Sequence, residues 1–229
     1  MTASAINSLR GAVNARVDAF GEQTLKEMES AAANLVLWAH YLSSSKSREV
    51  CDSLLDGTIA CVREAAACLA MGLVRPAIFA IRTQLELTLA WIYYNDHHIE
   101  WNGVREHPNN FKMRAEYLKY LRDNSPSFED RRLFLEKVRV RKLADPYGVL
   151  SSHVHSTSDA STPKNQDLSG IVESDKRCSE GVELQREVAE YVSDALAAWF
   201  ADSWMDFPEP IRTHIEGRLG EQGLKKFVA

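Results

Sequence analysis

Residues that end helices are scarce in this chain, which has only 11 glycines and 7 prolines among its 229 residues. Because these two residues punctuate turn-rich β folds, their scarcity favours a helical protein. The sequence also has no P-loop and no GxGxxG motif, the two common glycine-rich loops that bind phosphate. Its four cysteines lack CxxC spacing, which argues against a cysteine zinc site or a disulfide framework.

Long apolar runs are missing as well. The most apolar segment, residues 77–94, is interrupted by Arg82 and Glu86. A transmembrane helix needs about 20 mainly apolar residues, so this segment is too short and too charged to span a bilayer. The N-terminus has no continuous apolar stretch of the kind found in signal peptides. We therefore expect a cytoplasmic protein with no membrane partner.

Apolar residues recur at three- and four-residue spacing along most of the chain, which predicts amphipathic helices. Gly21 is expected to weaken or end the first helix, and the alanine-rich stretch 65–70 to let a neighbouring helix approach closely. No strand-like alternation and no internal repeat occurs. We predict one all-α domain over residues 1–229, a helical bundle of five to seven helices. A basic loop–helix insert is expected over about 96–146 and a C-terminal tail over 211–229.

Charge is unevenly distributed along the chain. The net charge is −5, yet residues 105–142 carry 11 basic and 6 acidic side chains. A basic face on an acidic protein can attract phosphate, which makes Arg139 and Arg141 candidate ligand-binding residues. A solvated helix surface explains the same pattern, and this alternative stays open.

Two charged residues stand inside the apolar segment 77–94. Arg82 and Glu86 are four residues apart, so they share one helix face and can pair. Charge in a core helix is costly unless it is paired or used. Either Arg82 binds an anionic group and Glu86 orients it, or the two residues form a structural ion pair.

A second polar cluster covers residues 147–156 and is followed by a polar, turn-rich segment, 156–170, that predicts a loop. Histidine titrates near neutral pH and is the best general acid or base here, which makes His155 a candidate catalytic residue. With Arg82 as a phosphate clamp and Tyr147 in an orienting role, His155 suits RNA cleavage by a neighbouring 2′-OH without metal or cofactor. Ser151 and His153 are candidate ligand-binding residues. The alternative is that these histidines cap or pack a helix end.

Metal-binding patterns are not present among the histidines. The chain shows neither HExxH nor the paired Glu-x-x-His spacing of helical metal sites. We therefore predict no metal site.

The order of these motifs resembles a known family. Arg82 and Glu86 on an apolar helix come first, then the basic insert, then the segment Tyr-x-x-Leu-Ser-x-x-Val-His from Tyr147 to His155. This order is similar to that of the divergent HEPN-like all-helical proteins associated with abortive infection and phage defence, over about residues 50–207. The resemblance implies a helical bundle that forms a homodimer. In active members it also implies metal-independent endoribonuclease activity on RNA, from an Arg and a His four to six residues apart on one helix, a spacing that this chain lacks.

Three hypotheses for function remain at this point. The first is a metal-independent endoribonuclease of a prokaryotic defence or toxin–antitoxin system, with His155, Arg82, Glu86 and Tyr147 as its catalytic residues. The second is a non-catalytic helical dimer or protein-interaction module, for which a cognate defence or antitoxin protein is a candidate partner. In that case the same residues form a structural cluster. The third is a small-ligand site between helices.

Overall fold

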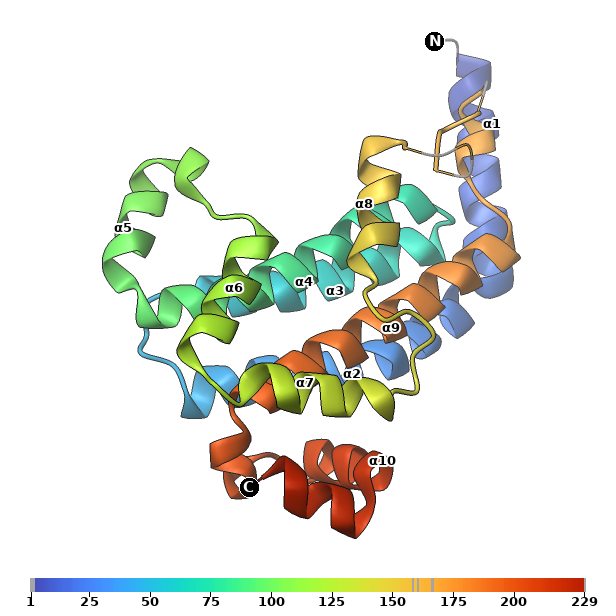
Figure 1. The fold of residues 1–229 in the computed structure, drawn as a ribbon. Helices are drawn as coiled ribbons and strands as arrows, with labels where there is room; N and C mark the ends of the chain where they lie inside the picture. Colours follow the sequence, from blue (N-terminus) through green and yellow to red (C-terminus); the bar gives the residue numbers. More distant parts are fainter. Residues whose placement is uncertain (1–2, 158, 160, 166, 229) are drawn as a thin grey trace. The chain divides into compact units, whose positions relative to one another are not determined.

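All regular structure in the described part of the chain is helical, as predicted, and contains no strand (Figure 1). The structure, a computed structural model, describes residues 3–157, 159, 161–165 and 167–228. Its α-helices are α1 (Ala3–Arg16), α2 (Glu22–Ser45), α3 (Ser53–Ala70), α4 (Val74–Asp96), α5 (His98–Glu106), α6 (Arg114–Asn124), α7 (Phe128–Lys137), α8 (Tyr147–His155), α9 (Asp175–Trp199) and α10 (Glu209–Phe227). These ten helices exceed the expected five to seven, because the region from 98 to 155 folds into four short helices. Within the same described residues, no helix is long and apolar enough to cross a membrane.

The chain forms two compact units. Unit 1 comprises Met1–Ala33, Ala60–Gln84 and Asp145–Val188, and unit 2 comprises Asn34–Ile59, Leu85–Ala144 and Ala189–Ala229. Four of the helices, α2, α3, α4 and α9, contribute residues to both units. The expectation of a single domain over 1–229 stays a prediction.

In unit 1, α3 and α9 approach each other closely. A Cβ atom on Gly181 of α9 would lie 2.7 Å from the Leu69 side chain of α3, so glycine is the residue that fits there. Ala65 and Leu69 are fully buried, in agreement with the expected close approach at this alanine-rich stretch. The buried amides of Gln84 and Gln185 exchange hydrogen bonds of 3.0 and 2.7 Å, which joins α4 to α9 and satisfies both side chains.

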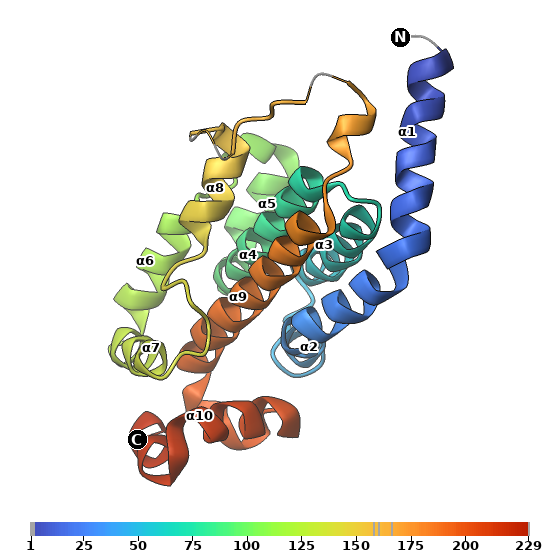
Figure 2. The same ribbon diagram turned by 90° about the vertical axis from the view of Figure 1, so that its right-hand side faces the viewer.

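The first helix does not end at Gly21. Instead, a π-helical turn, Val17–Gly21, connects α1 to α2, and Figure 2 shows the one helix following the other. Arg16 is buried beside this turn, where its guanidinium donates to Asp175 at 2.7 Å and to Thr24 at 3.0 Å. The same guanidinium lies over the ring of Phe20, 4.7 Å from its centroid. Charge-assisted hydrogen bonds thus stabilise the π-helical turn, and no helix end forms at Gly21.

A buried charge cluster organises unit 2. Asp194 of α9 accepts hydrogen bonds of 2.7 and 3.2 Å from Arg218 of α10 and lies 3.4 Å from Arg141. The side chains of Arg141 and Asp194 are each only 2% exposed. Glu190, one helical turn before Asp194, accepts from the backbone N–H groups of residues 140 and 141, both at 2.8 Å. The segment expected as a C-terminal tail therefore includes a helix that is fixed to α9 by paired charges.

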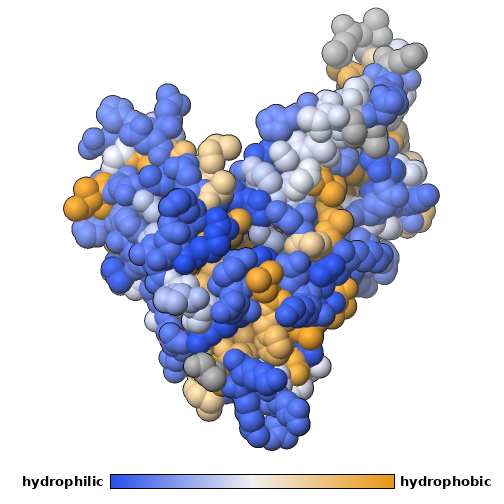
Figure 3. Space-filling model, in the orientation of Figure 1, coloured by the Kyte–Doolittle hydropathy of each residue, from blue (hydrophilic) through white to orange (hydrophobic). Residues whose placement is uncertain are grey.

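Some apolar side chains of unit 2 reach the surface around α7. Leu133 is 41% exposed and Val140, just after the helix, is 72% exposed. Figure 3 shows hydrophobic residues among hydrophilic ones on the face that carries α7. Single exposed apolar residues are normal on a protein surface and carry no functional argument alone.

Candidate functional site: a cationic pocket in unit 1

The α8 helix lies against the first half of α4, and the two run in opposite directions. Arg75, at the start of α4, donates to the Ser156 hydroxyl that follows α8, at 3.1 Å. Seven residues later, Arg82 donates to the hydroxyl of Tyr147, the first residue of α8, at 2.9 Å. Leu150, between these contacts, is fully buried and anchors the short helix. Arg75 therefore lies beside the C-terminal end of α8, which is the end that carries the histidines.

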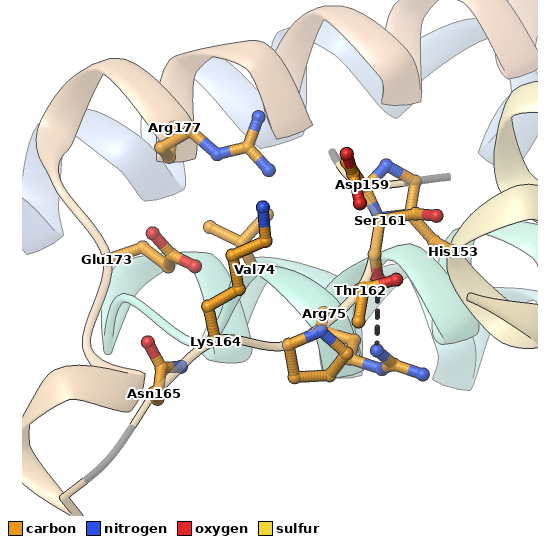
Figure 4. A pocket seen from close by; sticks show the side chains of 11 residues that line it. Val74, Arg75, His153, Asp159, Ser161, Thr162, Lys164, Asn165, Glu173 and Arg177 are labelled. Atoms are coloured by element: carbon orange, nitrogen blue, oxygen red, sulfur yellow. Dashed lines mark hydrogen bonds between the residues drawn. The ribbon is translucent and has the colours of Figure 1, made fainter. Parts of the chain in front are cut away.

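A pocket of about 430 Å³ opens at this end of α8 (Figure 4). It is formed by the start of α4, by α8, by the segment after α8 and by the region where α9 begins. The residues that line it are Val74, Arg75, His153, Asp159, Ser161, Thr162, Pro163, Lys164, Asn165, Glu173 and Arg177. Three residues of the segment 156–170, at positions 158, 160 and 166, lie outside the described residues.

Three cationic side chains line the pocket, Arg75, Lys164 and Arg177. In Figure 4 the ammonium group of Lys164 and the guanidinium of Arg177 point toward one another. Arg75 donates to the backbone oxygen of Ser161 at 3.2 Å, which ties the segment after α8 to α4. Arg177 also pairs with the partly exposed Glu180 at 2.6 Å, whereas Lys164 makes no ion pair with any described residue. The three cations outnumber the two carboxylates of the lining, Asp159 and Glu173, so the site is suited to an anionic group that also donates hydrogen bonds, and α4 and α9 both begin beside it.

His153 is the titratable imidazole of the pocket. Burial lowers the pKa of His153 below the ordinary value of 6.5, and the charges of Arg177 and Arg75 lower it further. At neutral pH the imidazole is therefore mainly uncharged and can accept a proton. An uncharged base next to cationic groups is the combination that proton transfer at a phosphate ester requires.

The structure brings some of the sequence-predicted site residues together and separates others. Arg82 and Tyr147 are joined, since the guanidinium also lies over the phenol ring at 5.0 Å. Arg82 and Glu86 are both half-buried and lie one turn apart on α4, as the sequence predicts. Ser151 lies half-buried on α8 but does not line the pocket.

His155 lies apart from the pocket. It is the exposed last residue of α8, and no described side chain forms a hydrogen bond with it. Residues two apart on a helix do not share a face, so His155 and His153 project in different directions. His155 as the acid or base stays a prediction, while the pocket contains His153.

Arg139 and Arg141 belong to unit 2. Arg139 is exposed and donates to the backbone oxygen of Glu136 at 3.1 Å. Arg141 is enclosed in the charge cluster with Asp194, where its side chain has almost no solvent contact. Its contacts are those of a structural ion pair.

No described cysteine has the character of a nucleophile. All four are free thiols, and burial raises the pKa of each, to about 12 for Cys51. The thiolate is the reactive form, so a raised pKa disfavours a nucleophilic role for these side chains. Across the described ranges, no three His, Cys, Asp or Glu side chains are grouped so that they could hold a metal ion.

Sequence reasoning missed the three cations of the pocket. Pro76 marks the start of a helix in the sequence, and Arg75 directly precedes it. The side chain of Arg75 could therefore have been expected near a helix N-terminus. Lys164 and Arg177 lie in segments that the sequence describes only as a loop and a helix start. Only the fold brings these two side chains to the same pocket.

Comparison with known proteins gave no match to a family model, to a curated protein or to a solved structure. The function is therefore argued from the pocket itself.

Proposed function

We propose that this protein is a HEPN-like helical protein that binds RNA and cleaves it without metal, in a prokaryotic defence or toxin–antitoxin system. The observation that carries the proposal is the pocket of unit 1, where the uncharged imidazole of His153 lines the same space as Arg75, Lys164 and Arg177. A base and a set of cations are what cleavage of an RNA phosphodiester by its own 2′-OH needs.

The reaction uses each group in a separate role. His153 takes the proton of a ribose 2′-OH, and the freed oxygen attacks the adjacent phosphorus. The bond from phosphorus to the 5′-oxygen breaks, that oxygen takes a proton from solvent, and a 2′,3′-cyclic phosphate remains. Arg75, Lys164 and Arg177 stabilise the negative charge that builds up on the phosphate oxygens. General-base catalysis of this kind contributes about 10²–10⁴-fold to the rate.

The contact between Arg82 and Tyr147 supports the HEPN-like part of the proposal. The resemblance rests on two motifs far apart in the sequence, and this hydrogen bond joins them at 2.9 Å. The pair fixes the start of α8 on α4 and so helps to position His153, which lies six residues further along the same helix.

The test is RNA cleavage by three purified proteins: wild type, His153→Ala and His155→Ala. Each is incubated with bulk RNA, with and without a chelator, after circular dichroism has shown an unchanged fold. We expect the wild type and His155→Ala to cleave RNA in the presence of chelator, and His153→Ala to lose at least about 100-fold in rate. Loss of activity in His155→Ala alone would move the catalytic role to His155. Absence of cleavage by the wild type would overturn the proposal.

A second candidate function is a non-catalytic helical dimer or interaction module with a cognate defence or antitoxin protein as partner. The observation that favours it is the engagement of Arg82, whose guanidinium is both hydrogen-bonded to and stacked on Tyr147. Light scattering of the purified chain tests the dimer directly. A monomer at micromolar concentration would contradict it, whereas a dimer without RNA cleavage would favour this function over the first.

A further inference from the structure

We propose that the pocket takes one ribonucleotide of single-stranded RNA, with the phosphate at Lys164 and Arg177 and the ribose 2′-OH at the side of Asp159 and His153. The inference rests on the proposed function, because it names the substrate class of the same site. The proposed function already requires ribose for cleavage, and the inference adds that binding itself distinguishes ribose from deoxyribose.

The size of the pocket limits its ligand. A volume of about 430 Å³ lies near the lower end of the range for small-molecule pockets, about 300–1,000 Å³. This space suits a single nucleotide unit. In single-stranded RNA, nucleotides are free to splay out of the stack and enter such a pocket, while in a duplex they are held by pairing and stacking.

The phosphate position follows from the cations. Lys164 and Arg177 approach each other from the segment after α8 and from α9, and their charged ends point toward one another in Figure 4. Because Lys164 makes no ion pair with a described residue, its ammonium is available for a charge-assisted hydrogen bond to a phosphate oxygen. Arg177 supplies a second donor group from the opposite wall.

The ribose position follows from the acceptors. The pocket also contains the carboxylates of Asp159 and Glu173, which would repel a bare anion. Figure 4 shows Asp159 and His153 at one side of the pocket and Glu173 with Asn165 at the other, so the two cations lie between the carboxylates. A carboxylate beside a phosphate subsite accepts hydrogen bonds from sugar hydroxyls, as acidic residues do in dinucleotide-binding proteins. The 2′-OH is the donor that RNA has and DNA lacks.

The experiment is calorimetric titration with three probes: adenosine 3′-monophosphate, its 2′-deoxy analogue and inorganic phosphate. We expect the ribonucleotide to bind about tenfold more tightly than the deoxynucleotide, the effect of one hydrogen bond to a charged group. Inorganic phosphate is expected to bind more weakly than either nucleotide.

Three variants assign the contacts. Lys164→Ala should weaken both nucleotides by the same factor, because both carry the phosphate. Asp159→Ala should remove the tenfold difference between them. Lys176→Ala is the matched control, since it removes an exposed positive charge next to Arg177 but outside the pocket lining. Lys164 and Asp159 are exposed, so their substitution leaves the core intact.

Equal affinity for the ribonucleotide and the deoxynucleotide would overturn the inference. Phosphate binding as tight as nucleotide binding would overturn it as well, because the pocket would then be a simple anion site. If the wild type distinguishes the two nucleotides but does not cleave RNA, the proposed function fails and the inference stands. If it cleaves RNA but binds both nucleotides equally, the inference fails and the proposed function stands.

Discussion

Replacement of Asp194 by alanine should strongly destabilise the protein. The Asp194 carboxylate accepts two hydrogen bonds from Arg218 and lies 3.4 Å from Arg141, and its side chain is only 2% exposed. Both arginine side chains are buried as well, at 2% and 5% exposed. Without the carboxylate, two guanidinium groups in low dielectric lose their shared counter-charge, with Glu190 as the remaining acid near Arg218.

The size of the effect follows from the burial of the cluster. Loss of one partner of a buried ion pair costs about 3–5 kcal/mol in the free energy of unfolding. In a protein of 150–250 residues, each kcal/mol lowers the midpoint of thermal unfolding by about 2–4 °C. We therefore expect Asp194→Ala to lower Tm by roughly 6–20 °C, the product of these two ranges.

The assay is thermal unfolding followed by circular dichroism at constant pH and salt. Asp206→Ala serves as the matched control in the same unit, because Asp206 is 66% exposed and pairs with Lys46 at 3.6 Å. An exposed pair of this kind contributes at most about 1 kcal/mol. A Tm for Asp194→Ala equal to that of Asp206→Ala would refute the view that the buried cluster stabilises unit 2.

Further predictions concern four single substitutions. Gly72→Ala should destabilise the protein by about 1–3 kcal/mol, because Gly72 has a φ of +81° and its Cβ would lie 2.7 Å from Val172. Gly217→Ala, in the open interior of α10, should instead stabilise it by about 0.5–1 kcal/mol, and chemical denaturation that ranks the two alike would contradict this. Burial and the charge of Arg218 lower the pKa of His214 below 6.5. At a pH between the pKa of the folded chain and that of the unfolded chain, the unfolded chain therefore binds a proton at His214 and the folded chain does not. Stability should therefore fall as pH drops below about 6.5, less steeply in His214→Gln, and unfolding curves from pH 5 to 8 with equal slopes for both proteins would exclude this contribution. Tyr147→Phe, which keeps the ring but loses the hydrogen bond from Arg82, should cost about 0.5–1.5 kcal/mol, and an unchanged Tm would argue against a structural pair.

The helical class was predictable because it depends on local pattern. Apolar spacing of three and four residues predicts helices, and the structure forms helices wherever that spacing is strong. The number of helices was not predictable to the same degree. The short helices α5 to α8 contain only 9 to 11 residues each, too few for a clear period, and they are held by tertiary packing at positions such as Trp101 and Leu150.

The candidate site was predictable only in part. The contact of Arg82 with Tyr147 joins two clusters that stood out because polar residues interrupt apolar sequence. The cationic pocket gave no such signal, since Arg75, Lys164 and Arg177 lie at helix starts and in a loop, where charge is ordinary. Their convergence depends on the start of α4, the segment after α8 and the start of α9 lying around one pocket, a long-range arrangement that no local period encodes.

The π turn between α1 and α2 holds one residue more than an α-helical turn. Each residue of an α-helix advances the chain by about 100° around the helix axis, and a π turn accommodates the extra residue in a wider hydrogen-bonded loop. Deletion of one residue from Val17–Gly21 would therefore close this segment as an ordinary α-helical turn, and α1 would keep its rotation relative to α2. Arg16 would still face Asp175 and Thr24. A lost residue is thus absorbed here as a change of helix type, whereas the same deletion within α1 or α2 would rotate one part of the helix by roughly 100° relative to the other.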